Sequence, residues 1–174
     1  MASLITPEAL EREHIKHRYE GGGELHKQPY GVSGWRWVRD VRKLAELVGA
    51  SDVLDYGAGK MTLERDLSEH LPTHSYDPVT APTPPEPADI VVCTDVLEHI
   101  EPDSLDTVLA DIKRLANKAV HIAVPKHPPE KGDQYLTIEE LSWWEDRLAK
   151  HWPNYEKTIL EAGTPRLVFT GFSE

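Results

Sequence analysis

The stretch VLDYGAGK, from Val53 to Lys60, places two glycines one residue apart directly after a short apolar segment. A strand that turns sharply into a helix needs glycine, because glycine adopts backbone angles that other residues avoid. A second glycine lets a ligand approach the main chain, and the following helix start offers N–H groups to it. Gly57 and Gly59 therefore predict a ligand-binding turn, with the alternative that they only shape a tight turn.

An acid at the end of the next predicted strand favours the ligand-binding interpretation. In dinucleotide-binding folds an acidic residue roughly 20 positions further on binds ribose hydroxyls, and Asp77 occupies that place at the end of THSYD. Thr62 stands where the dinucleotide fingerprint has its third glycine. Because only a pyrophosphate requires the complete fingerprint, the shortened turn and Asp77 together predict a nucleoside ligand.

Strand-like and helical segments alternate around these residues. The predicted strands occupy residues 51–56, 73–77, 88–95 and 118–125 and two segments within 155–172. The predicted helices occupy residues 7–20, 33–49, 61–71, 102–118 and 137–152. This alternation predicts an α/β fold with a mostly parallel sheet, helices on both faces and a C-terminal antiparallel hairpin.

The length of 174 residues predicts a single domain. Residues 1–49 would form N-terminal helices and a possible lid, and residues 50–174 would form the core. Ser33 is the expected cap of the helix that Gly49 ends. Thr137, with Glu140 three residues later, is the expected capping box of the last helix.

Composition and charge narrow the function classes. The net charge of −11 argues against long-range attraction to nucleic acid. A single cysteine, Cys93, has apolar neighbours, which predicts a buried residue in a chain without internal disulfides and a reducing compartment. We find no signal-peptide pattern and no apolar run near the ~20 residues that cross a bilayer. We therefore expect a cytoplasmic protein that does not span a membrane.

Three segments in this order, VLDYGAGK, SYDP and ADIVVCTDVLEHIEP, resemble motifs I, II and IV of class I S-adenosylmethionine-dependent methyltransferases. The likeness covers residues 51–125 and is most specific in TDVLEHIEP. More narrowly, the combination is similar to small methyltransferase-like proteins of phages and bacteria. The resemblance implies a three-layer Rossmann-like fold, S-adenosylmethionine as cofactor, and methyl transfer to a small molecule or a nucleotide.

The resemblance also implies site residues, position by position. Asp77 would bind the ribose hydroxyls, and Thr94 and Asp95 would lie beside the sulfonium and the substrate entrance. The implied cofactor-binding residues are Asp55, Gly57, Ala58, Gly59, Asp77, Pro78, Thr94 and Asp95. In this superfamily the segment before motif I often closes over the cofactor and substrate. The corresponding lid or substrate residues here are Tyr30, Ser33 and Trp35.

The connection between the second and third predicted strands departs from the family pattern. The superfamily normally has a helix, a strand and another helix there, whereas this chain has only PVTAPTPPEPA between Asp77 and Asp89. A segment so rich in proline forms neither a central strand nor a helix. The third strand of the family is therefore expected to be missing or vestigial, and Pro78 with its loop would have to enclose the adenine, or leave it open.

His99 is the candidate general base. Asp95 lies four residues earlier, so on a helical turn its carboxylate would hold the imidazole, and both residues are candidate catalytic groups. The alternatives are that His99 only packs against or caps the following helix, and that Glu98 pairs with a nearby cation.

The remaining histidines and tryptophans favour structural roles. His14 and His17 have the spacing of metal ligands, but without a further ligand at a recognisable spacing they predict a solvated helix face and no metal site. His121 is expected in the interior of a strand, and His127 in a loop near the ligand side. The three tryptophans near the last helix are expected to pack in the core or at an interface, with an aromatic platform for a ligand as the alternative. They are Trp143, Trp144 and Trp152.

Two other functions remain open at this point. A degenerate methyltransferase fold could act as a binding or interaction module without catalysis, which the missing strand favours. A different use of the same cofactor, with transfer of another of its groups, is not separated from methyl transfer by the sequence. The methyl acceptor and the oligomeric state are not specified by any motif.

Overall fold

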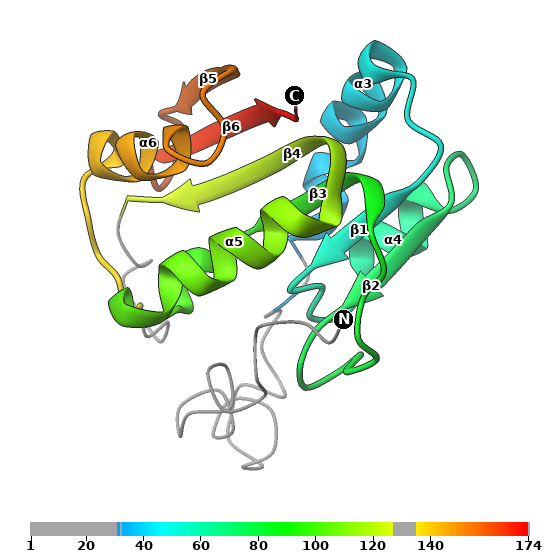
Figure 1. Ribbon diagram of the computed structural model, residues 1–174, viewed down its shortest axis with the longest axis horizontal. Coiled ribbons are helices and arrows are strands. Elements are labelled where there is room, and N and C mark those ends of the chain that lie inside the picture. The colour runs from blue at the N-terminus through cyan, green and yellow to red at the C-terminus, as the bar shows by residue number, and fades with distance from the viewer. Residues whose placement is uncertain (1–30, 32, 127–134, 174) are drawn as a thin grey trace.

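The computed structural model describes residues 31, 33–126 and 135–173. A six-stranded sheet with the strand order β2-β1-β3-β4-β6-β5 forms its centre (Figure 1). The strands are β1 (Val53–Tyr56), β2 (Thr73–Tyr76), β3 (Ala88–Thr94), β4 (Ala116–Pro125), β5 (Tyr155–Leu160) and β6 (Arg166–Phe172). The first four strands are parallel, and β6 runs antiparallel to both β4 and β5. The predicted mostly parallel sheet with a C-terminal hairpin is confirmed.

Helices cover both faces of the sheet and make the fold three-layered (Figure 1). Residues of α5 and α6 pack in one apolar cluster, and residues of α3 and α4 pack in the other. The helices are α3 (Val38–Val48), α4 (Thr62–Leu67), α5 (Leu105–Leu115) and α6 (Leu141–Ala149). Short 3₁₀ helices are η2 (Gly34–Trp37), η3 (Leu97–His99) and η4 (Pro102–Ser104). Because helices cover both faces, β1, β3 and β4 consist mainly of buried residues.

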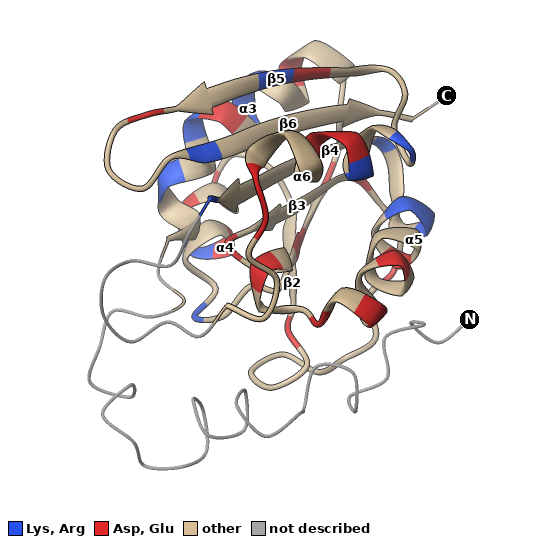
Figure 2. Ribbon diagram, turned by 90° about the vertical axis from the view of Figure 1, so that its left-hand side faces the viewer, with Lys and Arg blue, Asp and Glu red and all other residues tan. Residues whose placement is uncertain are grey.

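Charged residues of the described chain lie mainly on the helices and connections (Figure 2). In that view acidic and basic segments are interspersed over the helices, while the ribbons of the central strands carry few charged residues. None of the helices that the structure describes combines the length and apolar character needed to cross a bilayer.

The segment between β2 and β3 contains no further strand. Residues 77–87 are all described, and their pairing is limited to an isolated bridge between Asp77 and Ala81. The family's third strand is therefore missing, as predicted, and β2 becomes an edge of the sheet. The prolines explain this, because a proline has no N–H to donate to a neighbouring strand.

Two predicted helix caps differ from the structure. Ser33 precedes η2 but makes no side-chain capping hydrogen bond. The capping box at Thr137 is wrong, since α6 begins only at Leu141. The buried Thr137 hydroxyl instead donates to the carbonyl oxygen of Ile100 at 2.7 Å, so a tertiary contact replaced the local one.

Gly49 ends α3 with a left-handed backbone, as expected. The helix predicted over 7–20 lies outside the described residues.

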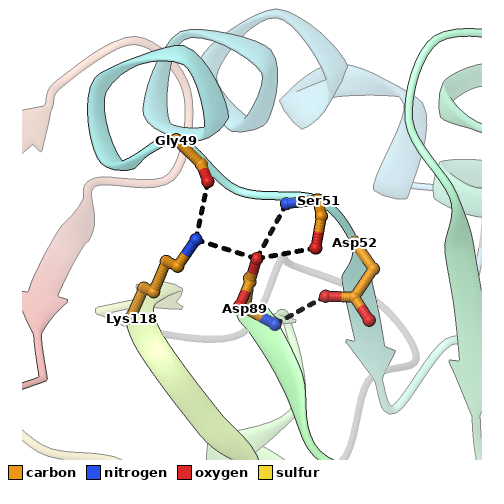
Figure 3. Close-up of polar contacts among 5 residues, drawn as sticks. All are labelled: Gly49, Ser51, Asp52, Asp89 and Lys118. Atoms are coloured by element: carbon orange, nitrogen blue, oxygen red, sulfur yellow. Dashed lines mark hydrogen bonds and ion pairs between the residues drawn. The ribbon is translucent and has the colours of Figure 1, made fainter.

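A polar cluster joins the amino ends of three parallel strands (Figure 3). One carboxylate oxygen of Asp89 accepts hydrogen bonds from the main-chain N–H of Ser51 at 2.8 Å and from the Ser51 hydroxyl at 2.9 Å. The same oxygen lies 3.0 Å from the Lys118 ammonium, which also donates to the Gly49 carbonyl. The Asp52 carboxylate accepts from the Asp89 N–H at 2.7 Å. This cluster fixes the strand starts on the edge opposite the candidate site.

Replacing Asp89 with alanine is expected to lower the free energy of unfolding by about 2 kcal/mol at neutral pH, because Ser51 and Lys118 lose their shared acceptor. The hydrogen bonds from Ser51 hold the pKa of Asp89 below its ordinary value. The contribution is therefore present above the unfolded pKa and is lost as the pH falls through the lower folded pKa. Denaturant titrations at pH 7 and pH 3 test this. Asp66→Ala, which removes an exposed partner of Arg65, is the control expected to change nothing measurable.

Candidate functional site

Both glycines of the turn after β1 have left-handed backbones, with φ of 83° at Gly57 and 53° at Gly59. A Cβ atom on Gly57 would lie 2.4 Å from Cγ2 of Val96, and a Cβ on Gly59 would lie 2.9 Å from Cα of Gly31. The close approach at each glycine is therefore made by the chain itself. Met61 also has a positive φ, of 54°, just before α4 begins.

The main-chain N–H groups of this turn already have acceptors. The Tyr76 carbonyl accepts from Gly57 at 2.7 Å and from the next residue, Ala58, at 3.0 Å. The Gly31 carbonyl accepts from Lys60, and the Ala58 carbonyl accepts from residue 61. Residues 57–61 therefore offer no unpaired N–H group to a ligand, because the turn folds back onto the end of β2 and onto Gly31. A ligand here would have to be held mainly by side chains.

Asp77 lies beside the glycine turn, as the sequence predicted, and its carboxylate points to it. Oδ2 accepts from the Gly59 N–H at 3.1 Å. Oδ1 accepts from the N–H groups of Val79 and Thr80 at 2.9 and 3.0 Å, which forms a tight turn around Pro78. A carboxylate has room for about four donors, and Asp77 receives three from described residues. Oδ2 therefore retains capacity for one more donor.

Thr80 is a site residue that sequence reasoning missed. Its hydroxyl donates to the Gly59 carbonyl oxygen at 2.7 Å. Together with the bonds to Asp77, this contact ties the start of the proline-rich loop to the glycine turn. The Asp-Pro-x-Thr spacing is a turn signal, but its contact with a residue 21 positions earlier carries no local signature.

Asp55, the last but one residue of β1, is a buried acid at the same turn. Burial, with the negative charges of Asp77 and Glu64 nearby, raises the pKa of the Asp55 carboxyl to about 7. Within the described part of the chain no side chain or N–H group hydrogen-bonds this carboxyl. A cation placed beside Asp55 would favour its ionised form.

Thr94 ends β3 and Asp95 follows it, so both lie at the carboxyl edge where ligands bind in open α/β sheets. Asp95 has a left-handed backbone, with φ of 56°, and its N–H donates to the Ala123 carbonyl. Its carboxylate accepts a hydrogen bond from Arg166 Nη1 at 2.8 Å. Strained backbone of this kind persists only where surrounding contacts hold it, and it is common at functional sites.

His99 and Asp95 are not arranged as the one-turn spacing predicted. The 3₁₀ helix η3 begins at Leu97, after Asp95, whose carboxylate bonds to Arg166 instead. The imidazole of His99 is nearly buried and lies edge-on to the Tyr135 ring, with centroids 5.0 Å apart. His99 remains near the carboxyl edge, but Asp95 does not hold its ring.

The segment before β1 contacts the glycine turn and the start of α4. Gly34 packs so closely against the start of α4 that an added Cβ would lie 2.8 Å from the Leu63 nitrogen. Trp35, the next residue, is 53% exposed, and its ring has the Arg36 guanidinium 5.9 Å above it. Ser33 lies at the start of this segment, and Tyr30 lies outside the described residues.

Several residues outside the site have the structural roles that were expected. Cys93 is buried, and burial raises the pKa of its thiol. His121 is buried with its ring edge-on to Trp37 at 5.2 Å, and burial lowers the pKa of its imidazole to about 4. Core packing, not an exposed platform, is found for Trp144 and Trp152. The predictions for His14, His17 and His127 concern residues outside those that the structure describes.

Gly57→Ala is expected to lower the free energy of unfolding by about 3 kcal/mol. The alanine would have to adopt a left-handed backbone, and its methyl group would overlap the side chain of Val96. Gly163→Ala is the matched control. Gly163 has φ of 77° but nothing within 4 Å of its added Cβ, so only the backbone cost of about 1 kcal/mol applies. Denaturant titration of both variants measures the difference. Equal losses would show that Val96 does not crowd the turn.

Neither a protein-family model nor a curated protein sequence matches the chain. Solved structures of methyltransferases do match it. Burkholderia thailandensis 1,6-didemethyltoxoflavin-N1-methyltransferase, solved with S-adenosylhomocysteine, has a TM-score of 0.65 and 19% identity, over 99% of this chain and 92% of that chain. Magnesium protoporphyrin IX methyltransferase from Synechocystis PCC 6803, solved with S-adenosylmethionine, has a TM-score of 0.60 and 14% identity, over 97% and 98%.

The mitomycin 7-O-methyltransferase is a third match, with a TM-score of 0.55 and 14% identity, over 97% of this chain and 69% of that chain. At such identities the likeness is one of fold. The chain therefore has the Rossmann-like fold of the class I S-adenosylmethionine-dependent methyltransferases, which confirms the predicted fold class.

Proposed function

We propose that this protein is an S-adenosylmethionine-dependent methyltransferase that acts in the cytoplasm on a small molecule or a nucleotide. The observation that carries the proposal is the pair of buried acids at the glycine turn. Burial, with the negative charge of Asp77 as the next cause, raises the pKa of Asp55 and favours its protonated form. A ligand that brings both positive charge and hydroxyl donors relieves this arrangement, and an adenosyl sulfonium with an amino acid tail has both.

The residues of the turn fit such a cofactor through their side chains. Asp55 would face its positively charged amino acid portion. Asp77 Oδ2, which keeps room for one donor beside the Gly59 N–H, would accept from a ribose hydroxyl. Pro78 and the loop tied down by Thr80 would flank the adenine. Two of the matching structures were solved with this cofactor or its product, which agrees with the choice.

The acceptor would bind beside Asp95 and His99, at the carboxyl ends of β3 and η3. Bound S-adenosylmethionine supplies an already activated methyl group. The protein's task is then to align the acceptor atom and to exclude water. His99 would remove a proton from an acceptor that carries one, with Tyr135 fixing the ring plane.

A non-catalytic binding module is the second candidate, and two observations favour it. Residues 77–87 lack the family's third strand, and the N–H groups of the glycine turn are occupied by the chain itself. Under this hypothesis the glycines serve only to pack the turn.

Calorimetry with S-adenosylmethionine and S-adenosylhomocysteine separates the two candidates. The enzyme proposal expects saturable binding of both, followed by transfer of labelled methyl from S-adenosylmethionine to some members of a panel of small-molecule and nucleotide acceptors. Absence of binding by either compound would refute it and leave the binding module.

A further inference from the structure

Arg166 forms a long-range contact at the acceptor side of the sheet. It is the first residue of β6 and pairs with Pro125, the last residue of β4. Its Nη1 donates to the Asp95 carboxylate at 2.8 Å, across a sequence separation of 71 residues. The two side chains are 17% and 23% exposed, so the pair is shielded but reachable from solvent.

The contact with Asp95 uses only one edge of the guanidinium. Arginine has five N–H donors in a fixed planar fork. Among the described residues, Nη1 is the one nitrogen of the Arg166 guanidinium with a hydrogen-bond partner. The remaining nitrogens, Nε and Nη2, can together donate to the two oxygens of a carboxylate or a phosphate.

A chain of contacts places Arg166 next to the candidate cofactor site. Asp95 is followed by Val96, whose Cγ2 lies 2.4 Å from the position of an added Cβ on Gly57. Arg166 thus contacts residue 95, and the glycine turn contacts residue 96. A group bound by the free edge of Arg166 would therefore lie close to Asp95, where the proposed function places the acceptor.

Lys126, the other cation of this corner, is a weaker candidate for such binding. It follows β4, and its ammonium lies 2.8 Å from the Glu140 carboxylate, with both side chains well exposed. Its N–H donates to the Pro165 carbonyl. An exposed lysine that already has a carboxylate partner supplies a point charge without directional preference, which makes it a matched control.

We propose that Arg166 binds an anionic group, a carboxylate or a phosphate, of the methyl acceptor, so that the protein selects anionic acceptors. The proposal rests on the proposed function for the identity of the acceptor. Asp95 orients the guanidinium and leaves its Nε–Nη2 edge for the anion. The same chemistry could serve the carboxylate of the cofactor's amino acid portion, and the experiment must separate these two sources.

Binding of small anion probes to ¹⁵N-labelled protein saturated with S-adenosylhomocysteine tests the proposal. Benzoate and phenyl phosphate are the anionic probes, and benzamide is the neutral match of benzoate. Amide shifts of Asp95 and of Leu167, next to Arg166, report binding. The same titrations are made with Arg166→Gln, with Arg166→Lys, which keeps the charge without the fork, and with Lys126→Gln.

We expect at least one anion to bind to the wild type and to Lys126→Gln, and at least tenfold more weakly to Arg166→Gln, with Arg166→Lys between them. Benzamide should cause no saturable shift. The affinity for S-adenosylhomocysteine, measured by calorimetry, should change less than twofold. An amide spectrum of Arg166→Lys that matches the wild-type spectrum would show that weaker anion binding does not come from a folding defect.

Three results would overturn the proposal. The first is that neither anion binds to the wild type, and the second is that each anion binds equally well to Arg166→Gln. The third is that Arg166→Gln weakens the binding of S-adenosylhomocysteine tenfold, which would mean that Arg166 binds the carboxylate of the cofactor and not an anion of the acceptor. If S-adenosylhomocysteine does not bind even to the wild type, the proposed function fails. The titrations of the unliganded protein then still show whether Arg166 binds anions.

Discussion

Asp77→Ala is expected to abolish detectable binding of S-adenosylmethionine and to lower the free energy of unfolding by about 4 kcal/mol. The carboxylate accepts three main-chain hydrogen bonds, from Gly59, Val79 and Thr80. Hydrogen bonds to a charged acceptor contribute about 1.5–3 kcal/mol each and are not fully additive. The same change removes the proposed acceptor for the ribose hydroxyl. Denaturant titration and calorimetry measure the two effects separately.

Two comparison variants make the Asp77 prediction specific. Asp77→Asn keeps an acceptor for Val79 and Thr80 but presents an amide to the Gly59 N–H, so it should retain more stability than alanine while still binding no cofactor. Thr80→Val removes only the hydroxyl bond to Gly59, and it should cost about 1 kcal/mol with cofactor binding retained. Cofactor binding of wild-type strength in Asp77→Asn would show that the carboxylate does not contact the ligand.

Asp55→Asn is expected to stabilise the ligand-free protein at pH 8 and yet to weaken the binding of S-adenosylmethionine at least tenfold. The pKa of the Asp55 carboxyl is raised from 3.8 to about 7 in the folded state. The folded state therefore binds more protons than the unfolded state between these values, and stability falls as the pH rises through this window. A pKa difference of about 3 units corresponds to a loss of roughly 4 kcal/mol in the free energy of unfolding. Because asparagine is neutral, the variant avoids this loss.

His121 supplies the opposite pH dependence as an internal comparison. The pKa of its imidazole falls from 6.5 to about 4 on folding, so its contribution to stability is lost as the pH falls through that range. His121→Leu should therefore make the protein less sensitive to acid between pH 6.5 and pH 4. Asp55→Asn should make it more sensitive over the same range. Denaturant titrations at several pH values would contradict this account if both variants changed the slope in the same direction.

The fold was predictable because its signals are local. Apolar runs such as ADIVVCTD became the buried β3, and left-handed Gly49 ended α3 as its sequence position indicated. The prolines between Asp77 and Asp89 correctly predicted the loss of a strand. Each of these signals depends on neighbours within a few residues.

The site was predictable in its acids and glycines but not in their partners. Asp77 reached the glycine turn as expected, whereas the packing of Gly31 on Gly59 and of Val96 on Gly57 required the folded chain. Positive φ at Asp95, which is not a glycine, also has no sequence signature. It arises together with a tertiary ion pair to Arg166.

The spacing argument for His99 failed for a similar reason. A four-residue separation predicts contact only within a regular α-helix, and the chain here forms a three-residue 3₁₀ helix that starts after Asp95. Thr137 likewise resembled a helix cap, but its hydroxyl found the Ile100 carbonyl. In both cases a polar side chain bonded to a distant partner instead of a local one.

A crystal structure of the protein with S-adenosylhomocysteine is the most direct test of the claim that Asp55 and Asp77 together hold an adenosyl ligand. The account predicts a ribose hydroxyl within hydrogen-bonding distance, about 2.7 Å, of Asp77 Oδ2, and the ligand's ammonium beside Asp55. A ligand bound elsewhere, or one whose ribose contacts neither acid, would contradict it.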